Sequence, residues 1–282
     1  MEFVLTTTCS REIETPAFVM LCFSDEPPSE ETAGGVLRML YESGEFTGKA
    51  NETAVVHRPE GMKAQRLLLI GCGEKGKFTP AQMRQAGGVM ARALQARSIQ
   101  QAAIRLKHPA NDPPMLRALV EGLITGSFEP DQYKTEKKNG GKPLERVEVS
   151  CIEITPGMQA ALETARVLGE AQNWTRALVN EPGNVLTPRA LGDRARAMAE
   201  ECGLECEVLD EPRMRQLGFN TLLGVAQGSA EPPVMIVTRY RPEAPATGDH
   251  LALVGKGVTF DTGGISIKPS DGMEKMKYDM AG

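Results

Sequence analysis

The sequence predicts an α/β protein, because short apolar strands alternate with amphipathic helices along the whole chain. Its 282 residues correspond to one large domain or two ordinary ones. Apolar residues make up 41% of the chain and charged residues 24%, a composition that supports packed cores and argues against disorder as the main state. Aromatic residues contribute only 5%, so aliphatic side chains and methionine are expected to fill those cores.

Residues 1–156 are expected to form an N-terminal α/β domain. The apolar run 66–71 ends in glycine and is typical of a buried parallel strand that is covered on both faces. A helix is expected to begin at Thr79-Pro80, with Thr79 as its cap and Gln82 completing a capping box.

The same domain continues with a strand over 102–106 and an amphipathic helix over 114–124. The polar, glycine-containing stretch 129–145 predicts a surface loop. Residues 146–154 alternate between apolar and polar side chains and are expected to lie at a sheet edge.

A long helical pattern over 157–180 contains the only tryptophan, Trp174, and is expected to connect the two domains. Residues 181–282 would then form the first part of a second α/β domain. Its first helix is expected to start at Thr187-Pro188 and to end at Gly203 as its C-terminal cap. Three strands are expected to follow, over 204–209, 234–240 and 251–254.

Charge and cysteine content narrow the function classes. The net charge of −5 argues against nucleic-acid and anionic-membrane binding, which both need excess positive charge. No apolar run is long enough to span a membrane, and the first residues do not resemble a secretory signal. The six scattered cysteines form no CxxC pair, which indicates free, mostly buried thiols in a reducing, cytoplasmic location.

The glycine-rich stretch 71–79 resembles a phosphate-binding P-loop but does not match it. Phe78 stands where that motif needs a hydroxyl, and the helix starts only at Thr79-Pro80. A surface turn is therefore favoured over nucleotide hydrolysis. The histidines His57, His108 and His250 lie far apart and lack the spacing of zinc ligands.

The segment that begins with the predicted strand 251–254 is the most informative. It is dense in glycine, lysine and carboxylate, and Lys256 and Asp261 come just after the strand. Ligands and catalytic groups gather at the carboxyl ends of strands in open α/β sheets. Lys268 precedes proline, which favours an extended backbone there.

At these residues the chain resembles the leucine (cytosol) aminopeptidases, the M17 peptidases. The resemblance rests on VGKGVTFDTGGISIKP (254–269) and MKYDMAG (276–282), and it extends to LVNEPGNVLTP (178–188) and LLGVAQGSAEPP (222–233). It implies an N-terminal macro-like α/β domain followed by an incomplete, zinc-peptidase-like α/β catalytic domain.

The resemblance also implies a function. The protein would be an intracellular aminopeptidase of protein turnover that uses two divalent ions, Mn²⁺ or Zn²⁺, to release leucine and other N-terminal residues from peptides. Lys256, Asp261 and Asp279 would be metal ligands, with Asp261 bridging both ions, and Lys268 would be the catalytic lysine that stabilises the oxyanion. Carboxylates suit these ions, and an ammonium aimed at developing negative charge stabilises a transition state. A homo-oligomer, a hexamer, is implied as well.

A lysine ligand must bind as the neutral amine, so we expect metal affinity and any activity to increase toward alkaline pH. The family's next motif, NTDAEGR, does not occur in the sequence. It would supply two further carboxylate ligands and the arginine that holds a bicarbonate. We therefore expect these residues to be part of a longer enzyme rather than a real short product, and the 282-residue chain alone to be inactive. Residues from about 170 onward are expected to be poorly stable alone.

Two alternatives belong to other classes. The first is a non-catalytic α/β module for binding or oligomer assembly, and the second is a nucleotide hydrolase that uses the imperfect glycine-rich stretch. Divalent metal content separates the peptidase from the module, and ATP binding tests the hydrolase.

Overall fold

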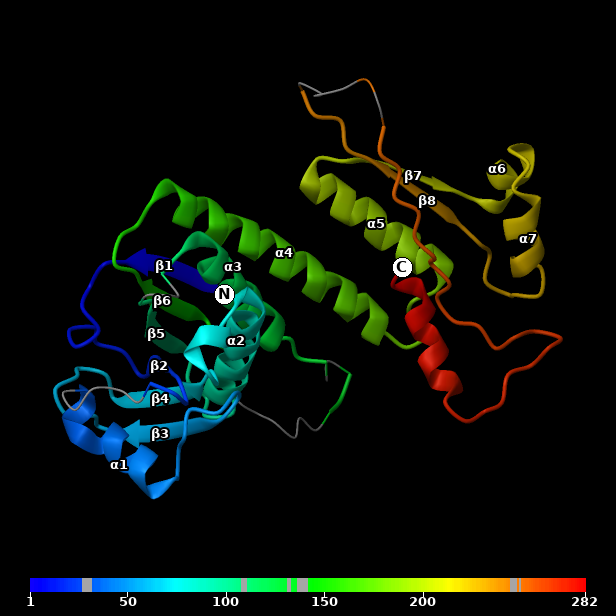
Figure 1. Ribbon diagram of the computed structural model, residues 1–282. Coiled ribbons are helices and arrows are strands. Elements are labelled where there is room, and N and C mark those ends of the chain that lie inside the picture. Colours follow the sequence, from blue (N-terminus) through cyan, green and yellow to red (C-terminus); the bar gives the residue numbers. More distant parts are fainter. Residues whose placement is uncertain (27–31, 108–110, 131–132, 136–141, 244–247, 249) are drawn as a thin grey trace. The chain divides into compact units, whose positions relative to one another are not determined.

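The structure of the chain is a computed structural model that divides into two compact units, residues 1–173 and 174–282 (Figure 1). It describes residues 1–26, 32–107, 111–130, 133–135, 142–243, 248 and 250–282. Part of the predicted loop 129–145, and His108, lie outside the described residues. Among the described residues, we find no helix that is long and apolar enough to cross a membrane.

The first unit contains a six-stranded sheet with the order β1-β6-β5-β2-β4-β3. All neighbouring strands run parallel except β3 and β4, which are antiparallel. The strands are β1 (Glu2–Thr6), β2 (Phe18–Cys22), β3 (Thr53–His57), β4 (Arg66–Gly71), β5 (Gln101–Arg105) and β6 (Arg146–Ser150).

The prediction of a buried strand at 66–71 is confirmed by β4. The prediction that 146–154 lies at a sheet edge is wrong, because β6 pairs with β1 on one side and β5 on the other. The first residues of the chain take the edge position instead, and Val147 and Val149 are fully buried.

The helices of this unit are α1 (Val36–Ser43), α2 (Pro80–Gln95), α3 (Pro113–Gly126) and most of α4 (Pro156–Asn180), with the 3₁₀ turns η1 (Thr32–Gly35) and η2 (Lys75–Lys77). The predicted capping box of Thr79 and Gln82 is present at the start of α2. Helix α3 begins where the Asp112 side chain accepts a hydrogen bond from the backbone N–H of Met115.

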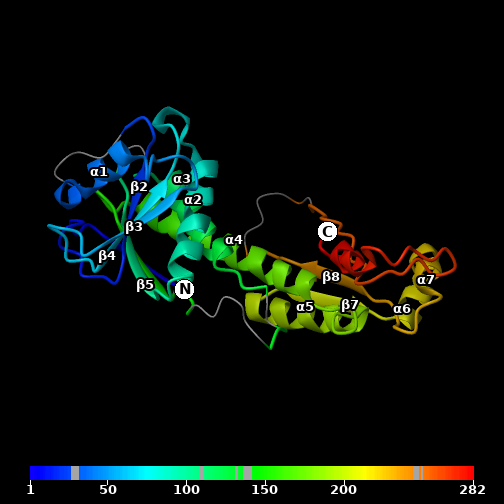
Figure 2. The ribbon, with the colours of Figure 1, turned by 90° about the horizontal axis from the view of Figure 1, so that it is seen from below.

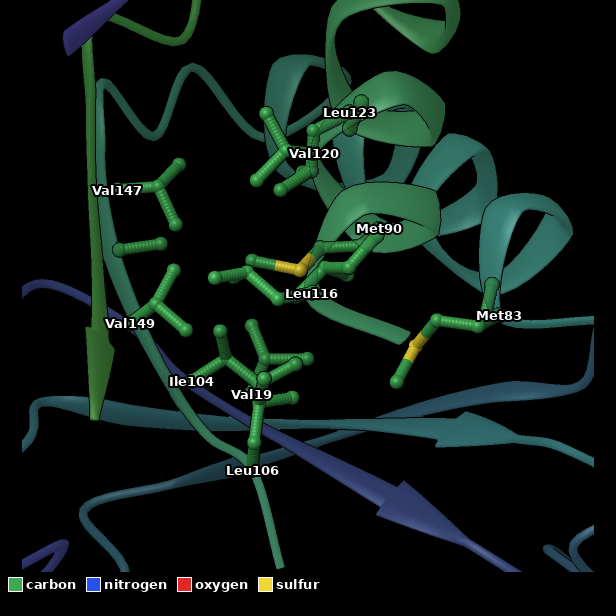
Figure 3. Packing of buried hydrophobic residues seen from close by; sticks show 14 of the residues in the cluster. Val19, Met83, Met90, Ile104, Leu106, Leu116, Val120, Leu123, Val147 and Val149 are labelled. Atoms are coloured by element: carbon green, nitrogen blue, oxygen red, sulfur yellow. The ribbon is translucent and has the colours of Figure 1, made fainter. Parts of the chain in front are cut away.

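Both faces of the central strands are covered by apolar cores. Alternate side chains of a strand point to opposite faces, so Leu68 and Ile70 of β4 pack in the core beneath α2 and α3. In this core Ile104 of the sheet lies opposite Met90 and Leu116 of the two helices (Figure 3). Leu67 and Leu69 pack in a second, smaller core beside α1. A parallel strand covered on both faces needs this continuous apolar run, which explains why the sequence predicted β4 well.

Glycines bring α2 and α3 into close contact. A Cβ at Gly122 would lie 2.1 Å from the backbone oxygen of Arg84, and one at Gly87 would lie 2.5 Å from that of Leu119. Backbones approach this closely only where side chains are absent. The crossing is flanked by Glu121, which is buried and paired with both Arg84 and Arg117.

The second unit pairs a helix with a two-stranded antiparallel ribbon. Helix α5 lies along β7 and β8 in both views (Figures 1 and 2). Its elements are α5 (Pro188–Cys202), β7 (Glu205–Leu209), α6 (Glu211–Gln216), α7 (Asn220–Ala226), β8 (Met235–Arg239) and the 3₁₀ helix η3 (Met273–Met280). As predicted, Thr187 caps α5, and Gly203 ends it in the left-handed conformation.

The predicted strand 251–254 does not form. Leu251, Leu253 and Val254 are 88%, 89% and 97% exposed, and the segment has no regular structure. A strand needs a neighbour that supplies backbone hydrogen bonds. In the described part of this unit the only ladder joins β7 to β8, so the apolar run 251–254 remains unpaired.

The cysteine prediction is only half right. Cys22, Cys72 and Cys151 are buried free thiols, whereas Cys9 and Cys202 are exposed and Cys206 is half-buried. The buried three lie at or just beyond the ends of central strands of the first unit, where the core is closed. The others lie near chain turns or on the ribbon of the second unit.

Candidate metal centre

The charged segment after residue 254 brings Lys256 and Asp279 together. The ammonium nitrogen of Lys256 donates to Asp279 Oδ2 at 3.0 Å; the Lys256 side chain is largely exposed and the Asp279 side chain is partly exposed. The two backbones are also close, because Gly282 N–H donates to the carbonyl of Lys256. A Cβ at Gly255 would lie 2.2 Å from the carbonyl oxygen of Gly282, so glycine is required for this approach.

A tight turn brings Lys268 and Asp261 together. Lys268 Nζ donates to Asp261 Oδ2 at 2.8 Å, and the other carboxylate oxygen accepts from Gly263 N–H at 2.7 Å. Lys268 Nζ also lies 3.4 Å from the sulfur of Met276. Gly263 has φ +91°, and a Cβ there would meet the carbonyl oxygen of Ser266 at 2.2 Å, so the turn needs glycine at this position.

The charges of the two pairs interact. The pKa of the Asp261 carboxyl is lowered, chiefly by the hydrogen bond from Lys268 and then by the one from Gly263 N–H. The positive charge of Lys256 acts in the same direction. The four residues singled out from the sequence thus form two ion pairs whose charges influence each other, here called the charged cluster.

Helix η3, which carries Asp279, is held against the end of α4. Lys277 Nζ donates to the carbonyl oxygen of Asn180, the last residue of α4, at 2.8 Å. Met280 is buried in a small core with Leu178 and Leu186. In Figure 1 the red end of the chain lies beside the end of α4.

The turn that follows α4 is fixed by a buried ion pair. Glu181 is 4% exposed, and its carboxylate accepts two hydrogen bonds from the Arg194 guanidinium, at 2.6 and 2.9 Å. Two parallel bonds of this kind fix orientation as well as distance. The same turn contains Gly183, where a Cβ would lie 3.1 Å from the Phe260 side chain, next to Asp261 in sequence.

The donor atoms of this segment, an amine and two carboxylates, are of kinds that bind divalent ions. Among the described residues no three His, Cys, Asp or Glu side chains gather at one point. A centre in this segment therefore depends on the amine of Lys256 together with the carboxylates of Asp261 and Asp279. Both carboxylates already hold a positive charge at hydrogen-bonding distance, and carboxylate oxygens suit Mn²⁺ and Zn²⁺.

The weaker candidates from the sequence gain no support. The glycine-rich stretch 71–79 forms the 3₁₀ turn η2, and helix α2 begins only after it, at Pro80. The backbone N–H of Lys75 is bonded to the Asp25 carboxylate. An acidic partner stands where a phosphate would have to bind. His57 and His250 are both exposed.

Sequence reasoning missed the residues that support the cluster. Lys277 lies in the MKYDMAG stretch that the resemblance marked, but its role could not be seen there, because the carbonyl that it contacts belongs to a residue 97 positions away. Glu181 lies in the NEPGN stretch that the resemblance marked, but its burial and its pairing with Arg194 depend on the fold.

Comparison with known proteins places both units. The "Cytosol aminopeptidase family, catalytic domain" matches residues 173–282, and the "Cytosol aminopeptidase family, N-terminal domain" matches residues 24–137. A "Probable cytosol aminopeptidase" of Solibacter usitatus is 54% identical over 243 residues, which cover 86% of this chain and 50% of the relative. One of Acidobacterium capsulatum is 40% identical and covers 100% of this chain and 59% of the relative.

Solved structures of related enzymes match almost the whole chain. The bottromycin maturation enzyme BotP in complex with Mn has 29% sequence identity and a TM-score of 0.74, over 97% of this chain and 54% of BotP. A mutant of tomato leucine aminopeptidase, at 22% identity, shares the fold with a TM-score of 0.84 over 100% of this chain and 57% of its own. The chain thus spans about half the length of the relatives it matches. Its two consecutive domain matches and its relatives show that the chain belongs to the M17 cytosol aminopeptidase family and comprises the N-terminal domain and part of the catalytic domain.

Proposed function

We propose that the protein is a metal-dependent aminopeptidase that releases N-terminal residues, leucine among them, from peptides in protein turnover. The observation that carries the proposal is the clustering of Lys256, Asp261, Lys268 and Asp279 in the part of the chain that matches the family's catalytic domain. The relatives' name and the manganese complex of BotP support the same activity and a divalent ion.

In this proposal Lys256, Asp261 and Asp279 hold the ions and Lys268 acts on the substrate. Two divalent ions bound there would polarise the scissile carbonyl and activate water. Mn²⁺ and Zn²⁺ are the candidates. The ammonium of Lys268 would then face the oxygen on which negative charge develops, where a fixed positive charge lowers the barrier.

The two ion pairs have a role in loading the site. Lys256 and Lys268 neutralise the carboxylates that the ions would bind. With Asp261 holding an ion, the ammonium of Lys268 would no longer be paired with that carboxylate and would be available to the substrate. Lys256 must give up its proton to become a ligand, which favours loading at alkaline pH.

The direct test is metal binding by the 282-residue chain. After incubation with Mn²⁺ or Zn²⁺ and gel filtration, elemental analysis should find a bound divalent ion, and Lys256→Met and Asp279→Asn should each lose it. Lys275→Met, an exposed lysine of the same segment, is the matched control and should retain it. Wild-type protein without any bound ion would argue for the non-catalytic module.

Activity is a separate question. The residues described here provide an amine and two carboxylates, and the relatives are about twice as long. We therefore propose that the 282-residue polypeptide alone does not cleave a leucyl substrate with Mn²⁺ present. Hydrolysis that Lys268→Met abolishes would overturn this part of the proposal.

We propose a cytoplasmic location because of the relatives' name and the free cysteines. The proposed substrates are peptides. A hexamer is proposed from the family alone, and sedimentation velocity measures it.

A further inference from the structure

We propose that Lys277 is a positioning residue, which holds Asp279 beside Lys256 by binding the carbonyl end of helix α4. The consequence for metal affinity rests on the proposed metal site, whereas the geometry rests on contacts of the chain itself.

The first step concerns the end of α4. The last carbonyls of a helix lack partners within the helix and carry partial negative charge, so a cation binds favourably there. Lys277 Nζ donates to the carbonyl oxygen of Asn180 at 2.8 Å, and its side chain is half-buried. Its ammonium also lies 5.6 Å from the ring centroid of Tyr278, which adds a cation–π contact.

The second step concerns the periodicity of η3. In a 3₁₀ helix, side chains three residues apart lie above one another. Lys277 and Met280 therefore share one row, and both contact the end of α4 or its neighbouring core. Met276 and Asp279 share the next row, and they contact Lys268 and Lys256 respectively. One row of η3 thus attaches the helix, and the other faces the charged cluster.

The third step concerns stability. A 3₁₀ helix is intrinsically weak, and Met280 is the only buried residue of η3. Its placement against the end of α4 therefore depends on two attachments, Lys277 and Met280, which flank Asp279. The turn to which η3 is attached is itself fixed by the pairing of Glu181 with Arg194. Removing the Lys277 contact should free Asp279 from its place without unfolding the unit.

The test uses the 282-residue chain with Lys277→Met, Lys277→Arg and, as the matched control, Lys275→Met. Hydrogen exchange of the metal-free proteins reports the order of residues 273–280. Calorimetric titration with Zn²⁺ or Mn²⁺ reports the affinity of the site, and circular dichroism verifies the fold.

We expect Lys277→Met to exchange faster over 273–280 and to bind the ion about tenfold more weakly, the effect typical of residues that support metal ligands. Lys277→Arg should restore both, and Lys275→Met should match wild type. The positioning role would be overturned if residues 273–280 of Lys277→Met exchanged as slowly as in the wild type. It would also be overturned if they exchanged faster while the affinity for the ion stayed unchanged. If the wild-type chain binds no ion, the metal site itself fails, and hydrogen exchange alone decides whether Lys277 holds η3.

Discussion

Lys256 Nζ and Asp279 Oδ2 lie 3.0 Å apart although 23 positions separate the two residues in sequence. An exposed ion pair of this kind contributes about 0–1 kcal/mol to stability, because water screens its charges and holding two long side chains costs entropy. Breaking this contact should therefore change the stability of the chain very little. A substitution here can test metal binding without a large effect on folding.

Lys256→Met is expected to change the free energy of unfolding by less than about 1 kcal/mol. The same variant should lose divalent-ion binding, because it removes one of the proposed ligands. Chemical denaturation measures the first quantity and calorimetric titration the second. If the variant lost much stability but still bound the ion, the pair of Lys256 and Asp279 would be a structural ion pair outside any metal site.

Arg194→Met is expected to destabilise the second unit by about 1–3 kcal/mol, because it leaves the buried Glu181 carboxylate without its main partner. Arg196→Met is the matched control. Arg196 lies on the same helix and pairs with Asp193 on the surface, so its loss should cost no more than about 0.5 kcal/mol. Urea denaturation, followed by the hydrogen exchange of the second unit, measures the stability of both variants. Equal losses of stability in Arg194→Met and Arg196→Met would contradict the prediction.

Stability is expected to fall as the pH rises above 9. Burial raises the pKa of the Cys22 and Cys72 thiols to about 12 from an ordinary value of 9.0. Between these values the folded state binds more protons than the unfolded state, so the free energy of unfolding decreases with pH. Denaturation between pH 8 and 11 measures the slope. Cys72→Ala should reduce it, whereas Cys202→Ala, at an exposed position, should leave it unchanged.

Two glycine substitutions within helices are expected to have opposite effects. Gly122→Ala places a Cβ against the backbone of α2 and should destabilise the first unit by about 1–3 kcal/mol. Gly224→Ala in α7 meets nothing within 4 Å and should stabilise the chain by about 0.5–1 kcal/mol, because alanine favours the helix. Thermal denaturation of both variants provides the comparison, and effects of the same sign would refute it.

Local patterns predicted the first unit well because its elements carry their own signals. The apolar run of β4, the capping box at Thr79 and the stripe of α3 each specify an element without reference to distant residues. The interior position of β6 was not predicted, because strand order depends on which segment occupies the edge of the sheet. Nothing in the sequence of β1 indicates that it pairs beside β6 at that edge.

The second unit shows where local patterns fail. Leu251–Val254 has the composition of a buried strand, but pairing requires a partner that the described residues do not provide. The four charged residues of the cluster were chosen from the motif, whereas their supports were not. Lys277 and Glu181 act through the end of α4 and through Arg194, contacts that exist only once the chain is folded.

The charge balance of the cluster governs how an ion would arrive. From Lys256 to Asp279 the sequence contains four lysines and four acidic residues, so the segment has no net charge. Such a surface exerts little long-range attraction on a dication in solution. Binding of the ion would then depend on close encounters in which a lysine ammonium moves away as the ion binds. The association rate of the ion should therefore vary only weakly with ionic strength.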